Sequence, residues 1–338
     1  MTMAPSEPAR SAAGAPAAEP AAGRVAPRMP EFFIVGHSKS GTTALYEMLR
    51  AQPGIFMPDL KEPVYFAKEL PRRAHRYQAP ETLEEYLELF APAAPSQRIG
   101  EASASYLWSR TAAAAIAEAQ PQARVIAILR EPASFLRSLH LQCVQSHYET
   151  EKDLGRALAL EDERRQGRRI PRNSPWPQVL LYSEHVRYVE QLERFHAVLA
   201  PEQVLTLIYD DFRRDNQATI SRVLRFLEVE EEVPVASVEA NPSERMRSQR
   251  LDELVHSVSV GASPLGRTLK APLMAVLPRR ARRGLLRATR RNLVVAPPDA
   301  PDERLMAELK RRYRPEVQAL SDYLGRDLIS EWGYSDVG

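Results

Sequence analysis

Three short apolar segments, each followed by a stretch with helical spacing, constrain this sequence more than any other feature. They cover residues 32–35, 124–130 and 204–209, and residues 98–103 form a weaker fourth candidate. Short apolar runs bounded by turn residues are typical of buried strands. Strands that alternate with helices form parallel sheets whose two faces are both covered. The sequence therefore predicts an α/β fold with a parallel β-sheet flanked by helices on both faces.

The helices of this fold are predicted from apolar residues at helical spacing. Pro132 suits the first turn of a helix, because its φ is already helical and its missing N–H would have no partner there. We expect helices over residues 43–50, 82–90, 132–143, 178–199 and 303–324, and one that follows residue 209 and ends at 227. The segment 148–177 is expected to be irregular and to contribute to a substrate pocket.

Length, charge and cysteine content exclude several classes of protein. The chain has 338 residues and 46 Lys+Arg against 44 Asp+Glu, and this balance argues against a dedicated nucleic-acid binder. The single Cys143 excludes an intrachain disulfide and a Cys-rich zinc module. No apolar run approaches the roughly 18 residues needed to cross a bilayer. We therefore expect a soluble, cytoplasmic protein.

The chain is expected to form one domain behind a short tail. Residues 1–30 are mostly Ala and Pro, a composition that cannot bury enough apolar surface to fold, and we expect them to be disordered. Residues 31–338 are expected to form a single α/β domain. In such open parallel sheets, ligands bind beyond the carboxyl ends of the strands. The junctions after residues 35 and 129 therefore point to one crevice.

The first of these junctions has the composition of a phosphate-binding loop. It reads Gly36-His37-Ser38-Lys39-Ser40-Gly41-Thr42-Thr43. Small residues allow successive N–H groups to face an anion, and the N-terminus of the following helix adds roughly half a positive charge. The nucleoside triphosphate loop has a lysine directly after its second glycine, where this chain has Thr42. The sequence thus predicts a P-loop-like anion site that departs from the loop of an ATPase.

The Ser-Lys-Ser-Gly-Thr-Thr loop resembles the 5′-phosphosulfate loop of sulfotransferases that use 3′-phosphoadenosine-5′-phosphosulfate (PAPS). Those enzymes end a later strand with an arginine that is followed eight residues on by a serine, as Arg130 and Ser138 are here. An arginine there can grip the 3′-phosphate through two parallel hydrogen bonds. The resemblance, which spans about residues 31–334, implies a donor site with these members: Ser38, Lys39, Ser40, Gly41, Thr42, Thr43, Arg130 and Ser138.

Further stretches resemble the heparan sulfate and carbohydrate branch of that superfamily. The segment Lys61-Glu62-Pro63-Val64-Tyr65-Phe66 is similar to one whose glutamate is the catalytic base. The resemblance therefore implies that Glu62 takes the proton of the acceptor hydroxyl, while Lys39 stabilises charge on the leaving phosphate. Because Pro63 restricts the residue before it, Glu62 is expected to be extended. The segment 99–106 resembles a Gly-Glu-Lys-x-x-x-Tyr motif, but Ala102 stands at its lysine position.

Several alternatives remain open at this stage. The base could be His140 or His147, which are seven residues apart and share a helical face with Ser138. The chain could be a P-loop kinase of a small molecule, with Asp210 after the third apolar strand as a magnesium ligand. It could also be a nucleotide-binding protein without chemistry.

The resemblance implies a hydroxyl of a carbohydrate, lipid or secondary metabolite as the acceptor, and transfer without a metal. Residues 267–291 hold nine basic residues and no acidic one. This basic stretch could attract an acidic acceptor or a membrane surface, or form a solvated helical face.

Overall fold

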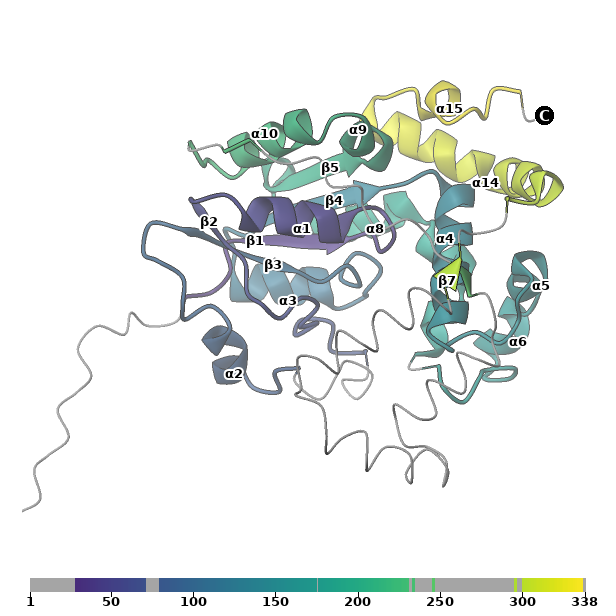
Figure 1. Ribbon diagram of the computed structural model, residues 1–338, viewed down its shortest axis with the longest axis horizontal. Coiled ribbons are helices and arrows are strands. Elements are labelled where there is room, and N and C mark those ends of the chain that lie inside the picture. Colours follow the sequence, from purple (N-terminus) through teal and green to yellow (C-terminus); the bar gives the residue numbers. More distant parts are fainter. Residues whose placement is uncertain are drawn as a thin grey trace, which may run out of the picture.

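A computed structural model describes residues 28–70, 79–174, 176–230, 233–234, 245–246, 295–296 and 300–336. Its centre is a five-stranded sheet in the order β2-β3-β1-β4-β5, in which every neighbouring pair is parallel (Figure 1). The strands are β1 (Phe32–Gly36), β2 (Ile55–Phe56), β3 (Arg98–Ala102), β4 (Arg124–Leu129) and β5 (Val204–Ile208). The predicted parallel sheet is confirmed, and the two-residue β2 is an addition to it.

Consecutive residues of β1 face opposite sides of the sheet, as the two-residue period of a strand requires. Phe33 and Val35 belong to one apolar core, Phe32 and Ile34 belong to the other, and all four are fully buried. Burying each such side chain contributes about 1.5–3 kcal/mol. The uninterrupted apolar run in the sequence is therefore explained by a central strand that is covered on both faces.

Helices cover both faces of the sheet (Figure 1). On one face lie α1 (Thr42–Arg50) and α10 (Asn216–Phe226). On the other lie α3 (Ala112–Ala119), α4 (Pro132–Gln145), α8 (Tyr188–His196) and α14 (Glu303–Leu324). The other elements in the described residues are α2 (Leu83–Glu88), α5 (Leu154–Ala159), α6 (Glu161–Arg165), α7 (Tyr182–His185), α9 (Tyr209–Arg214), α15 (Leu328–Glu331), the 3-10 turns Pro177–Leu180 and Pro201–Gln203, and the short antiparallel pair β6 (Arg245–Met246) and β7 (Val295–Ala296).

The long helix expected over residues 178–199 is wrong, because the chain forms a 3-10 turn, α7 and α8 there. Leu181 and Arg187 leave helical geometry, with ψ values of 70° and 64°. Side-chain hydrogen bonds to backbone groups stabilise these breaks. The His185 ring bonds the Gln178 carbonyl at 3.2 Å, and the Gln191 amide donates to the Glu184 carbonyl at 3.0 Å.

The helix expected between residues 209 and 227 is also divided, into α9 and α10. Asp215 is extended, with φ −146° and ψ 93°, and its carboxylate accepts from the Ala218 N–H at 2.9 Å. An aspartate in this position caps the second helix instead of continuing the first. The supposedly irregular segment 148–177 contains α5 and α6, whereas the helix over residues 303–324 is confirmed.

Two expectations fall on residues that the structure does not describe. They are the disordered tail, of which residues 1–27 lie outside the described ranges, and the basic stretch 267–291. Among the helices that are described, none is both long enough and apolar enough to span a membrane.

Candidate functional site

The loop between β1 and α1 depends on glycine at two positions. Gly41 has a φ of +91°, and a Cβ there would lie 3.0 Å from the Phe212 ring. At Gly36, a Cβ would lie 2.7 Å from the Cβ of Leu107. Since Gly41 is the N-cap residue, no side chain caps the first turn of α1. The N–H groups of this turn are therefore available to an anion, and the helix dipole favours negative charge there.

A cavity of about 290 Å³ opens beside this loop, at the carboxyl ends of the parallel strands. It brings together the loop, the end of β4, the middle and last turn of α4 and the segment between β2 and β3. Its walls carry the cations of Lys39, Lys61 and Arg130 and the carboxylate of Glu62. The other lining residues are Ser38, Gly41, Thr42, Thr43, Ala44, Ala104, Ser138, Gln142 and Tyr209. Cationic groups outnumber anionic groups, as a phosphate-binding crevice requires.

Arg130 and Ser138 enter this cavity from the end of β4 and from α4. The Arg130 guanidinium donates from Nη1 to the Lys39 carbonyl and from Nε to the Ser134 hydroxyl, both at 3.0 Å. Its carbon also lies 4.9 Å from the centre of the Tyr209 ring. These contacts hold the side chain against the phosphate loop, and the fork has five N–H donors in all.

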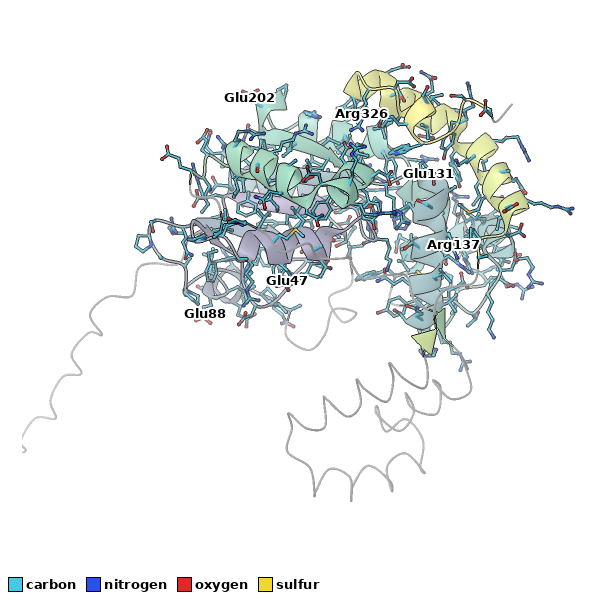
Figure 2. The ribbon with its side chains drawn as sticks, turned by 45° about the horizontal axis from the view of Figure 1, so that its top comes forward. Glu47, Glu88, Glu131, Arg137, Glu202 and Arg326 are labelled. Atoms are coloured by element: carbon cyan, nitrogen blue, oxygen red, sulfur yellow. The ribbon has the colours of Figure 1, made fainter. Side chains whose placement is uncertain are left out.

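The N-terminus of α4 is occupied by a carboxylate of the chain itself. Glu131 accepts from two N–H groups of the first turn, at 2.9 and 2.7 Å, and from the Tyr334 hydroxyl. Figure 2 shows Glu131 at this end of the helix and Arg137 further along it. A phosphate bound beside α4 would therefore be held by the side chains of Arg130 and Ser138, and not by the helix N-terminus.

Among the expected donor residues, Ser40 alone does not line the cavity. Its side chain is fully buried, and its hydroxyl has no hydrogen-bond partner among the described residues. Its backbone N–H donates to the His37 carbonyl at 3.2 Å, which closes a turn within the loop. In this structure Ser40 therefore shapes the loop.

Glu62 lines the same cavity. One carboxylate oxygen accepts from the Ala104 N–H at 2.8 Å, and the other lies 2.6 Å from the Lys61 ammonium. The extended backbone expected before Pro63 is wrong, because Glu62 has a φ of +62°. The Glu62 N–H donates to the Ala102 carbonyl at 3.0 Å, and this bond and the carboxylate bond together fix the left-handed turn.

The two histidines considered as alternative bases lie elsewhere. Neither His140 nor His147 is among the residues that line the cavity. The His140 ring bonds the Glu151 carbonyl at 2.8 Å, and its burial lowers the pKa of the imidazole. His147 follows the end of α4 with a φ of +58°, so the expected shared helical face does not extend to it.

The aspartate that a kinase would use for magnesium is engaged in packing. Asp210, at the start of α9, accepts from the indole N–H of Trp332 at 3.0 Å and is not a lining residue of the cavity. Tyr209 is the residue of this element that reaches the crevice. The geometry therefore favours the PAPS site that the sequence resemblance implies over the magnesium site of a kinase.

Glu101, which is not among the site residues predicted from the sequence, lies fully buried at the end of β3. Its carboxylate accepts hydrogen bonds from the hydroxyls of Ser103, Tyr86 and Tyr106, at 2.5, 2.8 and 3.0 Å. Burial raises the pKa of the Glu101 carboxyl to about 7. A carboxylate amid the apolar residues of a strand is the sequence signal that could have indicated this site.

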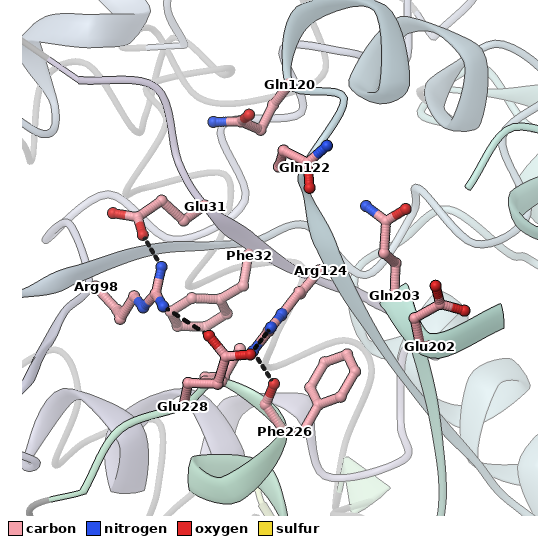
Figure 3. Close-up of a pocket in the computed structure, with 11 residues that line it drawn as sticks. Glu31, Phe32, Arg98, Gln120, Gln122, Arg124, Glu202, Gln203, Phe226 and Glu228 are labelled. Atoms are coloured by element: carbon pink, nitrogen blue, oxygen red, sulfur yellow. Dashed lines mark hydrogen bonds and ion pairs between the residues drawn. The ribbon is translucent and has the colours of Figure 1, made fainter. Parts of the chain in front are cut away.

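A larger cavity, of about 740 Å³, lies at the amino ends of the parallel strands (Figure 3). Its two arginines pair with glutamates: Arg98 bonds Glu31 at 2.6 Å and Glu228 at 3.2 Å, and Arg124 also pairs with Glu228. Paired cations attract an added anion weakly. The smaller crevice, beside the phosphate loop, is therefore the candidate functional site.

Comparison with known proteins points in the same direction. Carbohydrate sulfotransferase 15 of Mus musculus is 30% identical over 157 residues, which cover 35% of this chain and 28% of that protein. The Homo sapiens protein of the same name matches with the same identity and the same shares. The chain thus spans less than a third of the length of these relatives.

A solved structure and a family model cover more of the chain. The crystal structure of a sulfotransferase from Alicyclobacillus acidocaldarius superposes with a TM-score of 0.63 at 22% identity, over 90% of this chain and 98% of that one. The two proteins therefore share a fold. The model of the Sulfotransferase family matches residues 30–233. Because that match covers more than half of the chain, including the phosphate loop, Glu62 and Arg130, the chain belongs to the sulfotransferase family.

Proposed function

We propose that this protein transfers a sulfuryl group from PAPS to a hydroxyl group of a carbohydrate, lipid or secondary metabolite. One observation carries the proposal: the phosphate loop, Arg130 and Glu62 line a single cavity. A donor nucleotide and a base are the two components that such a transfer needs. Family membership supports the same activity.

The donor would be held at its two phosphate-bearing ends. The uncapped first turn of α1 and the hydroxyls of Thr42 and Thr43 suit the 5′-phosphosulfate. Arg130 and Ser138 suit the 3′-phosphate, which ATP lacks. Since the Arg130 guanidinium also donates to the Lys39 carbonyl, the two subsites are connected through one side chain.

In the proposed reaction, the acceptor oxygen forms a bond to sulfur as the bond between sulfur and the 5′-phosphate oxygen breaks. Glu62 takes the acceptor proton, and 3′,5′-diphosphoadenosine (PAP) leaves with the electron pair. Lys39 and Thr42, which line the cavity, stabilise the negative charge that develops on the leaving oxygen in this scheme. The scheme uses no metal ion.

The acceptor class is the less specific part of the proposal. Matched relatives are named carbohydrate sulfotransferases, and this supports a glycan hydroxyl at the level of a family resemblance. The lining of the cavity includes the polar side chains of Lys61 and Gln142 besides Glu62, and this suits an acceptor that carries several hydroxyl groups. The cytoplasmic location expected from the sequence stays a prediction.

The proposal is tested by incubating the protein with sulfur-labelled PAPS and an extract of the source cell, followed by mass identification of the labelled product. Glu62→Gln preserves shape and removes basicity, so turnover should fall by about 10²–10⁴-fold while PAP affinity is retained. The matched control is Glu84→Gln on α2, at an exposed position.

Three other results would contradict parts of the proposal. Full activity of Glu62→Gln together with inactivity of His140→Ala or His147→Ala would assign the base to a histidine. Tight PAP binding without transfer to any acceptor would indicate a nucleotide-binding protein. Phosphate transfer from ATP would indicate a kinase.

A further inference from the structure

The carboxylate of Glu101 is the centre of a buried hydrogen-bond network next to the segment that carries Glu62. In the described part of the chain, its hydrogen-bond partners are three hydroxyl groups and no cation. Tyr86 reaches it from α2, and Ser103 and Tyr106 reach it from the segment that follows β3. A buried carboxylate held in this way is costly to desolvate, and its retention calls for a reason.

Two of these hydroxyls also bind the segment that carries Glu62. The Ser103 oxygen accepts from the Val64 N–H at 3.0 Å, and the Tyr106 oxygen accepts from the Phe66 N–H at 3.2 Å. Each hydroxyl has a single proton to donate, and both hydroxyls use it in a hydrogen bond to the Glu101 carboxylate. An ionised carboxylate can only accept, so it turns both protons inward and leaves the oxygen lone pairs facing the segment.

The segment needs such support because its backbone is strained. Glu62 and Val64 have φ values of +62° and +53°, and a β-branched residue is a marked outlier in this region. Strained residues persist where surrounding contacts over-determine their geometry. The bonds at Val64 and Phe66 are contacts of this kind, and both lie within four residues of Glu62.

We propose that ionised Glu101 is a positioning residue: by orienting the Ser103 and Tyr106 hydroxyls, it holds the strained 62–66 segment so that the Glu62 carboxylate faces the cavity. The inference rests on the proposed function of Glu62 as the base. Protonated Glu101 would itself need an acceptor, and a hydroxyl that turned to accept would direct its own proton towards a segment N–H. The hold is therefore weaker when Glu101 is neutral.

The sign of the pH dependence follows from the surroundings of Glu101. Burial, the largest cause, raises the pKa of its carboxyl to about 7, the three hydroxyl bonds oppose that rise, and the nearby charge of Glu62 adds to it. The Tyr65 ring stacks on the Tyr86 ring, with 4.5 Å between the ring centres, and the Lys68 ammonium lies over the Tyr65 ring. The ionised form predominates above pH 7, so turnover should fall as the pH drops through this value.

The test compares Glu101→Gln and Tyr106→Phe with Tyr86→Phe. Each tyrosine variant removes one hydroxyl that donates to Glu101, but only Tyr106→Phe also removes an acceptor of a segment N–H. Glu101→Gln and Tyr106→Phe should lower kcat by about 10- to 100-fold, as for a misplaced catalytic group, with PAP affinity unchanged. Tyr86→Phe should stay close to the wild type. In Glu101→Gln, the fall of kcat near pH 7 should be absent.

A second measurement does not depend on activity. Hydrogen exchange at the Val64 and Phe66 amides should accelerate in Glu101→Gln, and at Phe66 in Tyr106→Phe, while exchange in β1 and β4 stays slow. Unchanged exchange at both amides, or equal losses of kcat in the two tyrosine variants, would overturn the inference. A wild-type protein that binds PAP without transferring sulfate would instead refute the proposed function and leave the exchange result to decide the role of Glu101.

Discussion

Lys39 stands in the phosphate loop at a left-handed backbone position, with a φ of +63°, and its side chain lines the cavity. Because the charge on the leaving oxygen appears only in the transition state, Lys39→Ala should lower kcat more than it weakens PAP binding. Steady-state kinetics and calorimetry on the same variant measure the two effects. Lys39→Arg should not restore full activity, since its planar fork is larger and differently directed.

The matched control for this prediction is Lys152→Ala, at an exposed position outside the cavity. Turnover of Lys39→Ala near that of the control would remove Lys39 from the proposed mechanism.

Arg130 gives a second prediction for a single residue. If it grips the 3′-phosphate, Arg130→Ala should cost about 2–4 kcal/mol of PAP affinity and leave the weaker affinity for adenosine 5′-monophosphate nearly unchanged. Calorimetry with both nucleotides measures this difference. Arg156→Ala, on an exposed part of α5, is the matched control. Equal affinity of the wild-type protein for the two nucleotides would contradict the assignment.

Local motifs predicted that the phosphate loop and the Arg130–Ser138 pair share one crevice, and apart from Ser40 these residues do line one cavity, while their roles stay predictions. The role proposed for Glu101 was not predictable in this way, because its tyrosine partners belong to two different elements and meet only in the folded chain. The left-handed turn at Glu62 was likewise hidden, since it is fixed by bonds to residues 102 and 104.

At the scale of elements, the C-terminal helices are attached to α9 by the Trp332–Asp210 hydrogen bond and by Arg326. Arg326, labelled in Figure 2, donates to Asp211 of α9 and to Glu331 of α15. Its hydrogen bonds lower the pKa of the Asp211 carboxyl, so the folded state favours the ionised form. Such a contribution is present above the unfolded pKa, about 4, and is lost as the pH falls below it.

Arg326→Gln should therefore lower the free energy of unfolding by about 1–2 kcal/mol at pH 7 and by much less at pH 3. Urea denaturation of the two proteins at both pH values measures the difference. Asp211→Asn should reproduce most of the loss at pH 7. A deficit of the same size at pH 3 would show that the arginine acts through packing and not through charge.

Elements with strong apolar patterns were predicted well from the sequence. Apart from β2, the strands of the central sheet contain the expected runs, and α14 has the expected bounds. The failures are the unexpected α5 and α6 and the breaks within amphipathic stretches, at Leu181, Arg187 and Asp215. At these positions hydrogen bonds to distant or capping groups outweigh a periodicity that would be compatible with one continuous helix.

For the whole molecule, binding of PAP should be visible as stability. A ligand present at 100 times its Kd stabilises the folded state by about 2.7 kcal/mol. We expect PAP to raise the melting temperature of the wild-type protein clearly and that of Arg130→Ala much less. Stabilisation by ATP with magnesium but not by PAP would favour the kinase alternative.

The separation of the paired charges from the crevice, at opposite ends of the parallel strands, has a consequence for engineering. Ion pairs lie at the amino ends of the strands and join Arg98 to Glu31 and Glu228, and Arg124 to Glu228. The crevice of the proposed chemistry lies at the carboxyl ends. Mutations more than about 10 Å apart with no shared partners usually contribute additively. Mutant libraries at the amino ends of the strands can therefore be selected for heat tolerance, and libraries at the carboxyl ends for activity on new acceptors. The best variants of each library can then be combined in one chain.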